Sequence, residues 1–226
     1  MNPILIVARR ELVSIVRARS VLAAAVLVGL FVGGMPIFTA LAMGRGIGGV
    51  YLQGPVLGVF LGYLFSQQAF LREKQDGTIE TVLASPLTLP ALWAGKVIGC
   101  AGAAALIALG CMGVAFAAAA FGAHAALPLS LLLAVHLLLL VPLVTAVSVG
   151  LLGLVQLVLG LRENQLQNIG LIMGLIALLS AGQVIVGEVP SVDIERTAVV
   201  VLAVVLFLLY RLAGRVDRER IVRTIG

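Results

Sequence analysis

Charged residues are scarce in this chain. Asp, Glu, Lys and Arg make up 11% of its 226 residues, whereas 62% are hydrophobic, and the mean hydropathy is +1.19. A soluble domain carries about a quarter charged residues, so this chain has too few to cover a surface in water. The composition predicts an integral membrane protein. The net charge of +5 does not indicate nucleic-acid binding, because the basic residues fall between apolar runs.

Cysteine and histidine are scarcer still, with two of each. Cys100 and Cys111 are 11 positions apart on one predicted helix, about 16 Å at 1.5 Å per residue, which is too far for a mutual disulfide. No His-Glu-x-x-His motif or other metal-ligand spacing occurs. Gly95-Lys96 lacks the upstream glycine and the Ser or Thr of a phosphate-binding loop. We therefore expect a non-catalytic chain with no metal or cofactor of its own.

Acidic residues are also missing from the apolar runs. On the boundaries below, all ten Asp and Glu residues fall in loops, tails or an interfacial helix. A proton-coupled carrier usually has a carboxylate inside the membrane. The pattern therefore argues against such a carrier and favours energy supplied from outside the chain.

The apolar runs predict an all-α integral membrane protein with six transmembrane helices. Residues 1–19 predict an N-terminal amphipathic helix at the membrane interface, with an apolar stripe of Leu5, Ala8, Leu12, Ile15 and Val16 opposite Arg10, Glu11, Ser14 and Arg17. Residues 20–226 form one domain. Its spans are expected at about 21–42, 51–71, 96–121, 129–160, 169–186 and 197–212. The fourth is long enough to tilt, to kink at Pro142, or to extend past the bilayer.

Basic residues are distributed unevenly over this layout. With both termini in the cytosol, 13 of the 15 Lys and Arg lie on the cytosolic side, and only Arg45 and Arg196 lie outside. This is a positive-inside bias. It predicts a multi-pass protein of the cytoplasmic membrane with cytosolic termini.

The longest polar interruption, residues 71–96, lies between the second and third spans. Asp76, Gly77 and Thr78 are capping-type residues, and Ile79, Val82 and Leu83 follow at helical spacing with Glu80 beside them. Ser85-Pro86 ends this segment. Thr88 is placed to cap the next helix, with Leu89-Pro90 in its first turn. The stretch predicts a short amphipathic helix on the cytosolic membrane surface.

The same stretch resembles the cytosolic loop of ABC-2 type (type V) exporter permeases. The matching residues are Arg72-Glu73-Lys74, Gly77-Thr78, Glu80, Leu83-Ala84, Ser85-Pro86 and Gly95-Lys96. In that family the loop is a coupling helix that docks into a separate ATPase subunit. The resemblance implies that the coupling residues are Arg72, Glu73, Asp76, Gly77, Thr78, Ile79, Glu80, Val82, Leu83 and Pro86.

The resemblance also implies an assembly. It has two permease subunits, identical or paralogous, and two ATPase subunits that bind ATP and Mg and move an unidentified substrate outward. We expect Glu73, Asp76 and Glu80 to pair with basic residues of the ATPase. We expect the apolar side chains of Ile79, Val82 and Leu83 to enter a groove of the ATPase. The loop also resembles that of the cytochrome c biogenesis permease CcmB. A small channel or carrier without an ATPase is the alternative from another class.

Polar residues within the spans are few, and His136, Gln156 and Gln183 are the candidates for a substrate path. Ordinary interhelical hydrogen bonds are the competing explanation for them. Glycine pairs four residues apart, such as Gly29/Gly33, Gly58/Gly62, Gly95/Gly99 and Gly170/Gly174, allow helices to approach closely. They fit packing within one subunit or a dimer seam, and the sequence assigns no pair to the seam.

Overall fold

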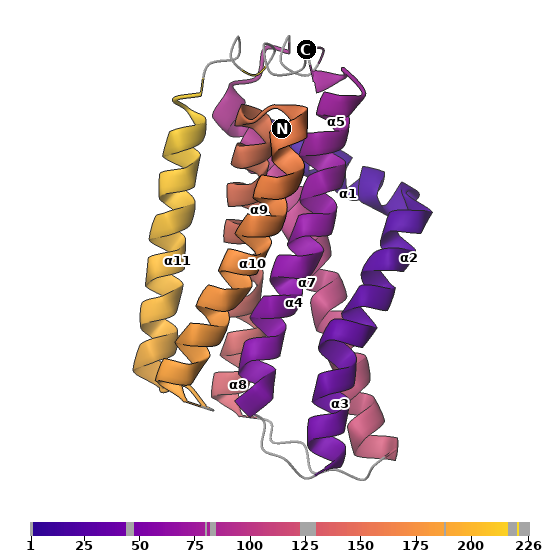
Figure 1. The fold of residues 1–226 in the computed structure, drawn as a ribbon, viewed down its shortest axis with the longest axis vertical. Coiled ribbons are helices and arrows are strands. Elements are labelled where there is room, and N and C mark those ends of the chain that lie inside the picture. The colour runs from indigo at the N-terminus through magenta and orange to yellow at the C-terminus, as the bar shows by residue number, and fades with distance from the viewer. Residues whose placement is uncertain are drawn as a thin grey trace.

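The computed structural model is a bundle of long helices crossed by one shorter helix (Figure 1). It describes residues 2–43, 48–79, 81, 85–122, 130–187, 189–216 and 221. The regular elements within these ranges are all helical: α1 Pro3–Arg17, α2 Arg19–Val28, η1 Gly29–Gly34, α3 Met35–Ala42, α4 Gly48–Ser66, η2 Gln67–Leu71, α5 Arg72–Gln75, α7 Leu89–Gly122, α8 Leu131–Val135, η3 His136–Leu140, α9 Val141–Val158, α10 Leu161–Val186 and α11 Val192–Ala213. This confirms an all-α protein.

Five helices in the described residues are long and apolar enough to cross a membrane. They are Arg19–Ala40, Gly49–Gln75, Leu89–Gly122, Leu131–Val158 and Leu166–Val186. The predicted sixth span lies within α11, which runs beside the others (Figure 1) and begins with Asp193, Glu195 and Arg196 in its first turns. The chain is thus a multi-pass membrane protein with at least five membrane-length helices.

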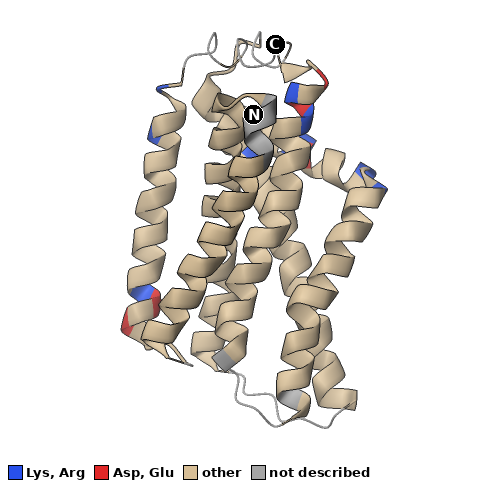
Figure 2. Ribbon diagram, in the orientation of Figure 1, with Lys and Arg blue, Asp and Glu red and all other residues tan. Residues whose placement is uncertain are grey.

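Charged residues gather at the two ends of the bundle, and the long middle section carries almost none (Figure 2). The end of the bundle that holds α1, α5 and the C-terminus of α11 is rich in Lys and Arg. The opposite end carries the acidic start of α11 and few cations. An uncharged band between two charged ends is the arrangement that a bilayer requires.

The long helix α7 is central and packs against α1, α4, α9 and α11. It begins at Leu89, directly after Thr88, so the predicted start of this helix is confirmed, although the span was expected only from residue 96. Its Ala- and Gly-rich surface lets neighbours approach closely, and the buried core includes Cys100, Ala104 and Ala108. Cys100 and Cys111 are both free and buried.

One predicted polar gap, residues 161–168, is helical instead, and so is the second half of another, residues 187–196. Residues 161–168 form the first turns of α10, and residues 192–196 form the first turns of α11. Polar side chains near a membrane surface need not end a helix, because the helical backbone satisfies its own hydrogen bonds. The sequence pattern located the change in polarity correctly, but it did not locate the residues at which α10 and α11 begin.

Three segments, η1, η2 and η3, are π-helical. Pro142 lies two residues after the end of η3. Because proline has no N–H, the regular backbone pairing fails there and a wider turn accommodates it. The long fourth span thus contains a π-helical turn close to Pro142. Single-turn π segments are frequent at functional sites, and η2 and η3 both adjoin polar clusters described below.

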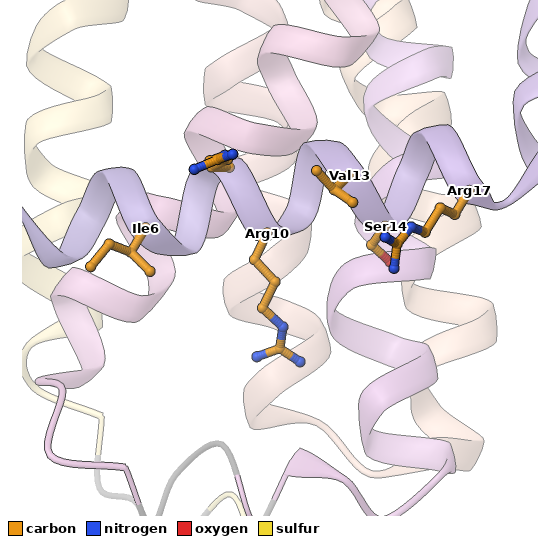
Figure 3. Close-up of a pocket in the computed structure, with 6 residues that line it drawn as sticks. Ile6, Arg10, Val13, Ser14 and Arg17 are labelled. Carbon is orange, nitrogen blue, oxygen red and sulfur yellow. The ribbon is translucent and has the colours of Figure 1, made fainter.

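The helix α1 crosses the long helices and packs mainly on α7 (Figures 1 and 3). Its buried face consists of Val7, Ala8, Glu11 and Ile15. The prediction is wrong for Glu11, which was placed on the polar face but is buried beside Ala8 and Ile15, whereas Leu5 and Val16 of the predicted stripe are exposed. Glu11 was assigned to the polar face because its side chain is charged. In the structure Lys96 of α7, which is also buried, pairs with that charge.

Candidate functional site

The polar stretch 71–96 starts as a direct continuation of α4 through η2 and α5. The turn after α5 ends at Gly77, whose φ of 68° lies in the left-handed region that glycine tolerates. The Thr78 hydroxyl donates to the Glu73 carbonyl at 3.2 Å. Asp76, Gly77 and Thr78 therefore form the turn that ends α5. Ile79 and Thr81, which follow this turn, are helical, and the rest of the predicted short helix lies outside the described residues.

Lys96 is the centre of a buried charge cluster at this end of the bundle. Its Nζ lies 3.1 Å from Glu11 Oε1, 2.8 Å from Glu73 Oε1 and 2.7 Å from the Ala69 carbonyl oxygen. An ammonium group has three N–H donors, so each has one acceptor. The Lys96 side chain is 2% exposed, and those of Glu11 and Glu73 are 7% and 16% exposed. The cluster ties α1, η2–α5 and α7 together.

The cluster carries more negative than positive charge. Two carboxylates face one ammonium, and Arg10 reaches the cluster only at its open edge, 3.9 Å from Glu73. The second oxygen of Glu73, Oε2, is buried and makes no hydrogen bond within the described residues. Buried charges are stable only when they are paired, so each member of the cluster holds the others in place.

Lys74 makes a second connection from the same turn. Its side chain is fully buried, and Nζ donates to the carbonyl oxygens of Leu157 and Leu159 at 3.2 and 2.5 Å. These residues lie at the C-terminus of α9, where carbonyls lack helical partners and the helix dipole favours a cation. Lys74 thus caps α9 and fastens α5 to it.

Gly95 and Gly99 allow α1 to lie directly on α7. A Cβ atom at Gly95 would come within 2.6 Å of Val7 Cβ, and one at Gly99 within 2.8 Å of the Ala8 carbonyl oxygen. This close approach places Glu11 beside Lys96. The Gly95/Gly99 pair therefore serves packing within one subunit, which was one of the two interpretations of the glycine pairs, and not a dimer seam.

The predicted coupling residues separate into an anchored and an exposed group. Glu73 is anchored in the cluster, and Ile79 is 1% exposed in the core of this chain, so its side chain is not presented to a partner. The exposed group is Arg72, Asp76, Gly77, Thr78 and Pro86, in which Arg72 and Asp76 form an ion pair at 3.6 Å. Glu80, Val82 and Leu83 lie outside the described residues. The turn thus has a fixed inner side and a free charged outer side.

The outer face of α1 adjoins this turn. Ile6, Arg9, Arg10, Val13, Ser14 and Arg17 line a shallow hollow along it. Figure 3 shows the side chains of Ile6, Arg10, Val13, Ser14 and Arg17 following one another along α1, with that of Arg10 extended. Mixed cationic and apolar side chains are typical of a helix at a membrane surface.

The three candidate path residues do not come together. Gln156 is buried and donates to the Ser66 hydroxyl at 3.2 Å, whereas Gln183 donates to the Gly187 carbonyl at 2.7 Å near the end of α10. His136 is buried in η3, with Nδ1 2.6 Å from Glu195 Oε1. The first two make ordinary local or interhelical bonds, and His136 alone belongs to a polar cluster.

Glu195 corrects the expectation that every acid lies outside the helical core. It is 4% exposed in α11 and bonded to His136 of a membrane-length helix. The sequence placed it in a loop because it adjoins Asp193 and Arg196. The argument against a proton-coupled carrier rested on the absence of acids from the helical core, so it no longer holds.

Several buried polar residues were not predicted as site residues. Among them are Glu11, Tyr51 and Glu195, and also Lys74 and Lys96, which the sequence analysis named only as part of the motif. One signal was available for Glu11, because it continues the spacing of Val7 and Ile15 at four-residue steps on the face that packs on α7. The partners of the others come from distant parts of the chain, and no local pattern reveals them.

Comparison with known proteins adds no assignment. No protein-family model matches the chain, and no curated protein matches it in sequence. The sites described above therefore carry the functional argument.

Proposed function

We propose that this chain is the transmembrane subunit of an ABC-2 type exporter, which moves its substrate with ATP hydrolysed by a separate ATPase subunit. The observation that carries the proposal is the anchoring of the motif residues Glu73, Lys74 and Lys96. They fix the base of the exposed turn to three helices. A passive connector between two spans has no need of such buried attachments.

The attachments suggest how a push from an ATPase would travel. Force on the exposed side of the turn, at Arg72 and Asp76, passes through Glu73 to Lys96 on α7 and Glu11 on α1. It passes through Lys74 to the end of α9. Coupling between sites requires elements that move together, and one turn here grips three helices. The neighbouring π segment η2 is a natural place for the bend.

In this proposal α11 is the sixth span, and the basic end of the bundle faces the cytosol. The support is the clustering of Lys and Arg at the end that holds α1 and α5 (Figure 2), which the positive-inside rule assigns to the cytosol. Both termini then lie in the cytosol and the membrane is the cytoplasmic one. The exposed turn lies on the side where ATP is available.

A second permease subunit would pack on α10. Only 6% of the membrane-length part of α10 is buried within this chain, and a Cβ atom at Gly170 or Gly174 would meet nothing within 4 Å. The other three glycine pairs contact helices of the same chain. Gly170/Gly174 is therefore the pair that we assign to the dimer seam.

A proton-coupled carrier without an ATPase is the second candidate. The buried His136–Glu195 pair favours it, because ionisable pairs between membrane helices are typical of proton pathways. It leaves the anchored turn at the other end of the bundle without a role. CcmB-like permeases stay a variant of the first proposal, since they share the same loop.

Co-purification tests the first proposal. The solubilised chain is isolated from its host and the associated proteins are identified by mass spectrometry. We expect a soluble protein with a phosphate-binding loop, and we expect its loss when Glu80→Ala and Leu83→Ala are combined. The matched control changes Asp193→Ala and Val192→Ala at the opposite end. Purification of the chain without any ATPase contradicts the proposal and favours the carrier.

A further inference from the structure

A second buried polar cluster lies at the end of the bundle away from α1, formed by Tyr51 of α4, His136 of η3 and Glu195 of α11. The three residues are 3%, 3% and 4% exposed. His136 Nδ1 lies 2.6 Å from Glu195 Oε1, and the rings of Tyr51 and His136 meet edge to face with centroids 4.9 Å apart. Three segments far apart in the sequence thus bring a phenol ring, an imidazole and a carboxylate into one contact group.

Each member of this cluster has a polar atom without a hydrogen-bond partner among the described residues. These atoms are Tyr51 Oη, His136 Nε2 and Glu195 Oε2. Leaving a buried polar atom unpaired is unfavourable, and three together in one cluster are exceptional. They indicate a place that a polar ligand completes.

All three atoms accept hydrogen bonds in one consistent arrangement. When Nδ1–H of His136 donates to Glu195, Nε2 is an acceptor, as are the second carboxylate oxygen and the tyrosine oxygen. The negative charge of Glu195 has no Lys or Arg within ion-pair distance in the described structure. A primary ammonium group offers three N–H donors and one positive charge. The tyrosine hydroxyl also has a donor of its own, so a water molecule can satisfy these hydrogen bonds, but it offers no positive charge for the carboxylate.

An apolar groove adjoins the cluster and shares Glu195 with it. The groove has a volume of about 420 Å³ and is lined by aliphatic side chains of α8, η3 and α11, among them Leu131, Val135 and Val200. Arg196 also borders the groove with an exposed side chain, and it forms no ion pair with Glu195. A ligand held at Glu195 by a cationic head has room for an alkyl chain beside it.

We propose that Tyr51, His136 and Glu195 bind the primary ammonium group of an amphiphile whose alkyl chain occupies the adjacent groove. As an assignment of the exporter's substrate class, this rests on the proposed function. The binding site itself does not depend on the exporter proposal. Glu195 supplies the charge, His136 orients the carboxylate, and Tyr51 completes the set of acceptors.

The test compares two amphiphiles on the purified full-length chain by native mass spectrometry. Dodecylamine has the three N–H donors, whereas dodecyltrimethylammonium has the same chain and charge but none. We expect at least tenfold tighter binding of dodecylamine. Tyr51→Phe, which removes one oxygen and keeps the ring, should weaken it threefold or more, and Glu195→Gln at least tenfold.

Two matched controls accompany these variants. Tyr63→Phe makes the same change elsewhere on α4, and Asp193→Asn removes an exposed negative charge two residues from Glu195; neither should alter binding. If Glu195→Gln does not fold, Tyr51→Phe still decides. Equal binding of both amphiphiles, equal effects of the control variants, or no binding of dodecylamine overturns the proposal.

The outcome is separable from that of the exporter proposal. The binding measurement uses the chain without any ATPase, and co-purification of an ATPase does not involve the amine. Dodecylamine binding without an associated ATPase supports the site and contradicts the exporter. An associated ATPase with no dodecylamine binding does the reverse.

Discussion

Replacement of Lys96 by methionine should be among the most destabilising single changes in this protein. Methionine fits the space of the lysine stem, but it leaves Glu11 and Glu73 facing each other in a buried site. Removal of one partner from a buried ion pair costs about 3–5 kcal/mol. The carbonyl of Ala69 also loses its donor. We expect a loss in the upper part of that range at pH 7.

Protonation of a carboxylate limits the loss and gives it a pH dependence. A glutamate of ordinary pKa, about 4.3, costs about 3.7 kcal/mol to protonate at pH 7 and about 1 kcal/mol at pH 5. In the Lys96→Met protein a buried carboxylate prefers its neutral form, so folding is favoured at low pH and disfavoured as the pH rises. The difference in stability between variant and parent should therefore shrink by 2 kcal/mol or more, on the order of that protonation cost, from pH 7 to pH 5.

Unfolding by SDS in mixed micelles, followed by fluorescence, measures this difference. The chain has one tryptophan, Trp93, which is 2% exposed and lies one turn before Lys96 in α7. The matched control is Arg72→Met, because Arg72 is an exposed cation of α5, next to Glu73, and its replacement should change stability by less than about 0.5 kcal/mol. Equal effects of the two substitutions, or a Lys96→Met deficit that is independent of pH, would refute the cluster's role.

Two further predictions concern glycines. Gly99→Ala should destabilise the protein by about 1–3 kcal/mol in the same assay, because its Cβ would lie 2.8 Å from Glu11 Cβ; Gly102→Ala, which meets nothing within 4 Å, should not, and equal losses would contradict the packing argument. Gly174→Leu should abolish a dimer detected by native mass spectrometry, whereas Gly113→Leu on open α7 surface should leave it intact; a dimer that survives Gly174→Leu excludes the α10 seam.

Much of the fold followed from hydrophobic periodicity. The all-helical membrane architecture and the start of α7 at Leu89 were predicted from apolar runs and capping residues. These features depend on local composition, which a sequence states directly. The first residues of α10 and α11 were missed, because hydropathy reports where a helix enters the apolar region and not where its backbone hydrogen bonds begin.

The candidate sites were harder to predict because their partners are remote in sequence. Glu11 and Lys96 are separated by 85 positions, and His136 and Glu195 by 59. A charged residue beside an apolar run looks like a loop residue until its counterion is known. The motif did identify Glu73 and Lys96 as special, but only the structure shows that they bond to each other.

The anchored turn also changes how the motif is interpreted. Sequence reasoning assigned Arg72, Glu73 and Asp76 to recognition of a partner. In the structure Glu73 and Lys74 face inward and Arg72 and Asp76 outward. We infer that the inner residues transmit motion and the outer residues recognise the partner, which separates two kinds of variant. Changes at Arg72 or Asp76 should weaken assembly, and changes at Lys74 should leave assembly intact.

The most direct test of the central claim is photo-crosslinking in the host cell from the exposed turn. A benzoylphenylalanine at position 76 replaces Asp76, whose side chain is 57% exposed, and a second protein carries it at the exposed position 193 on the opposite end. The account predicts an adduct with a phosphate-loop ATPase from position 76 and none from position 193. Absence of that adduct from position 76, or the same adducts from both positions, would contradict it.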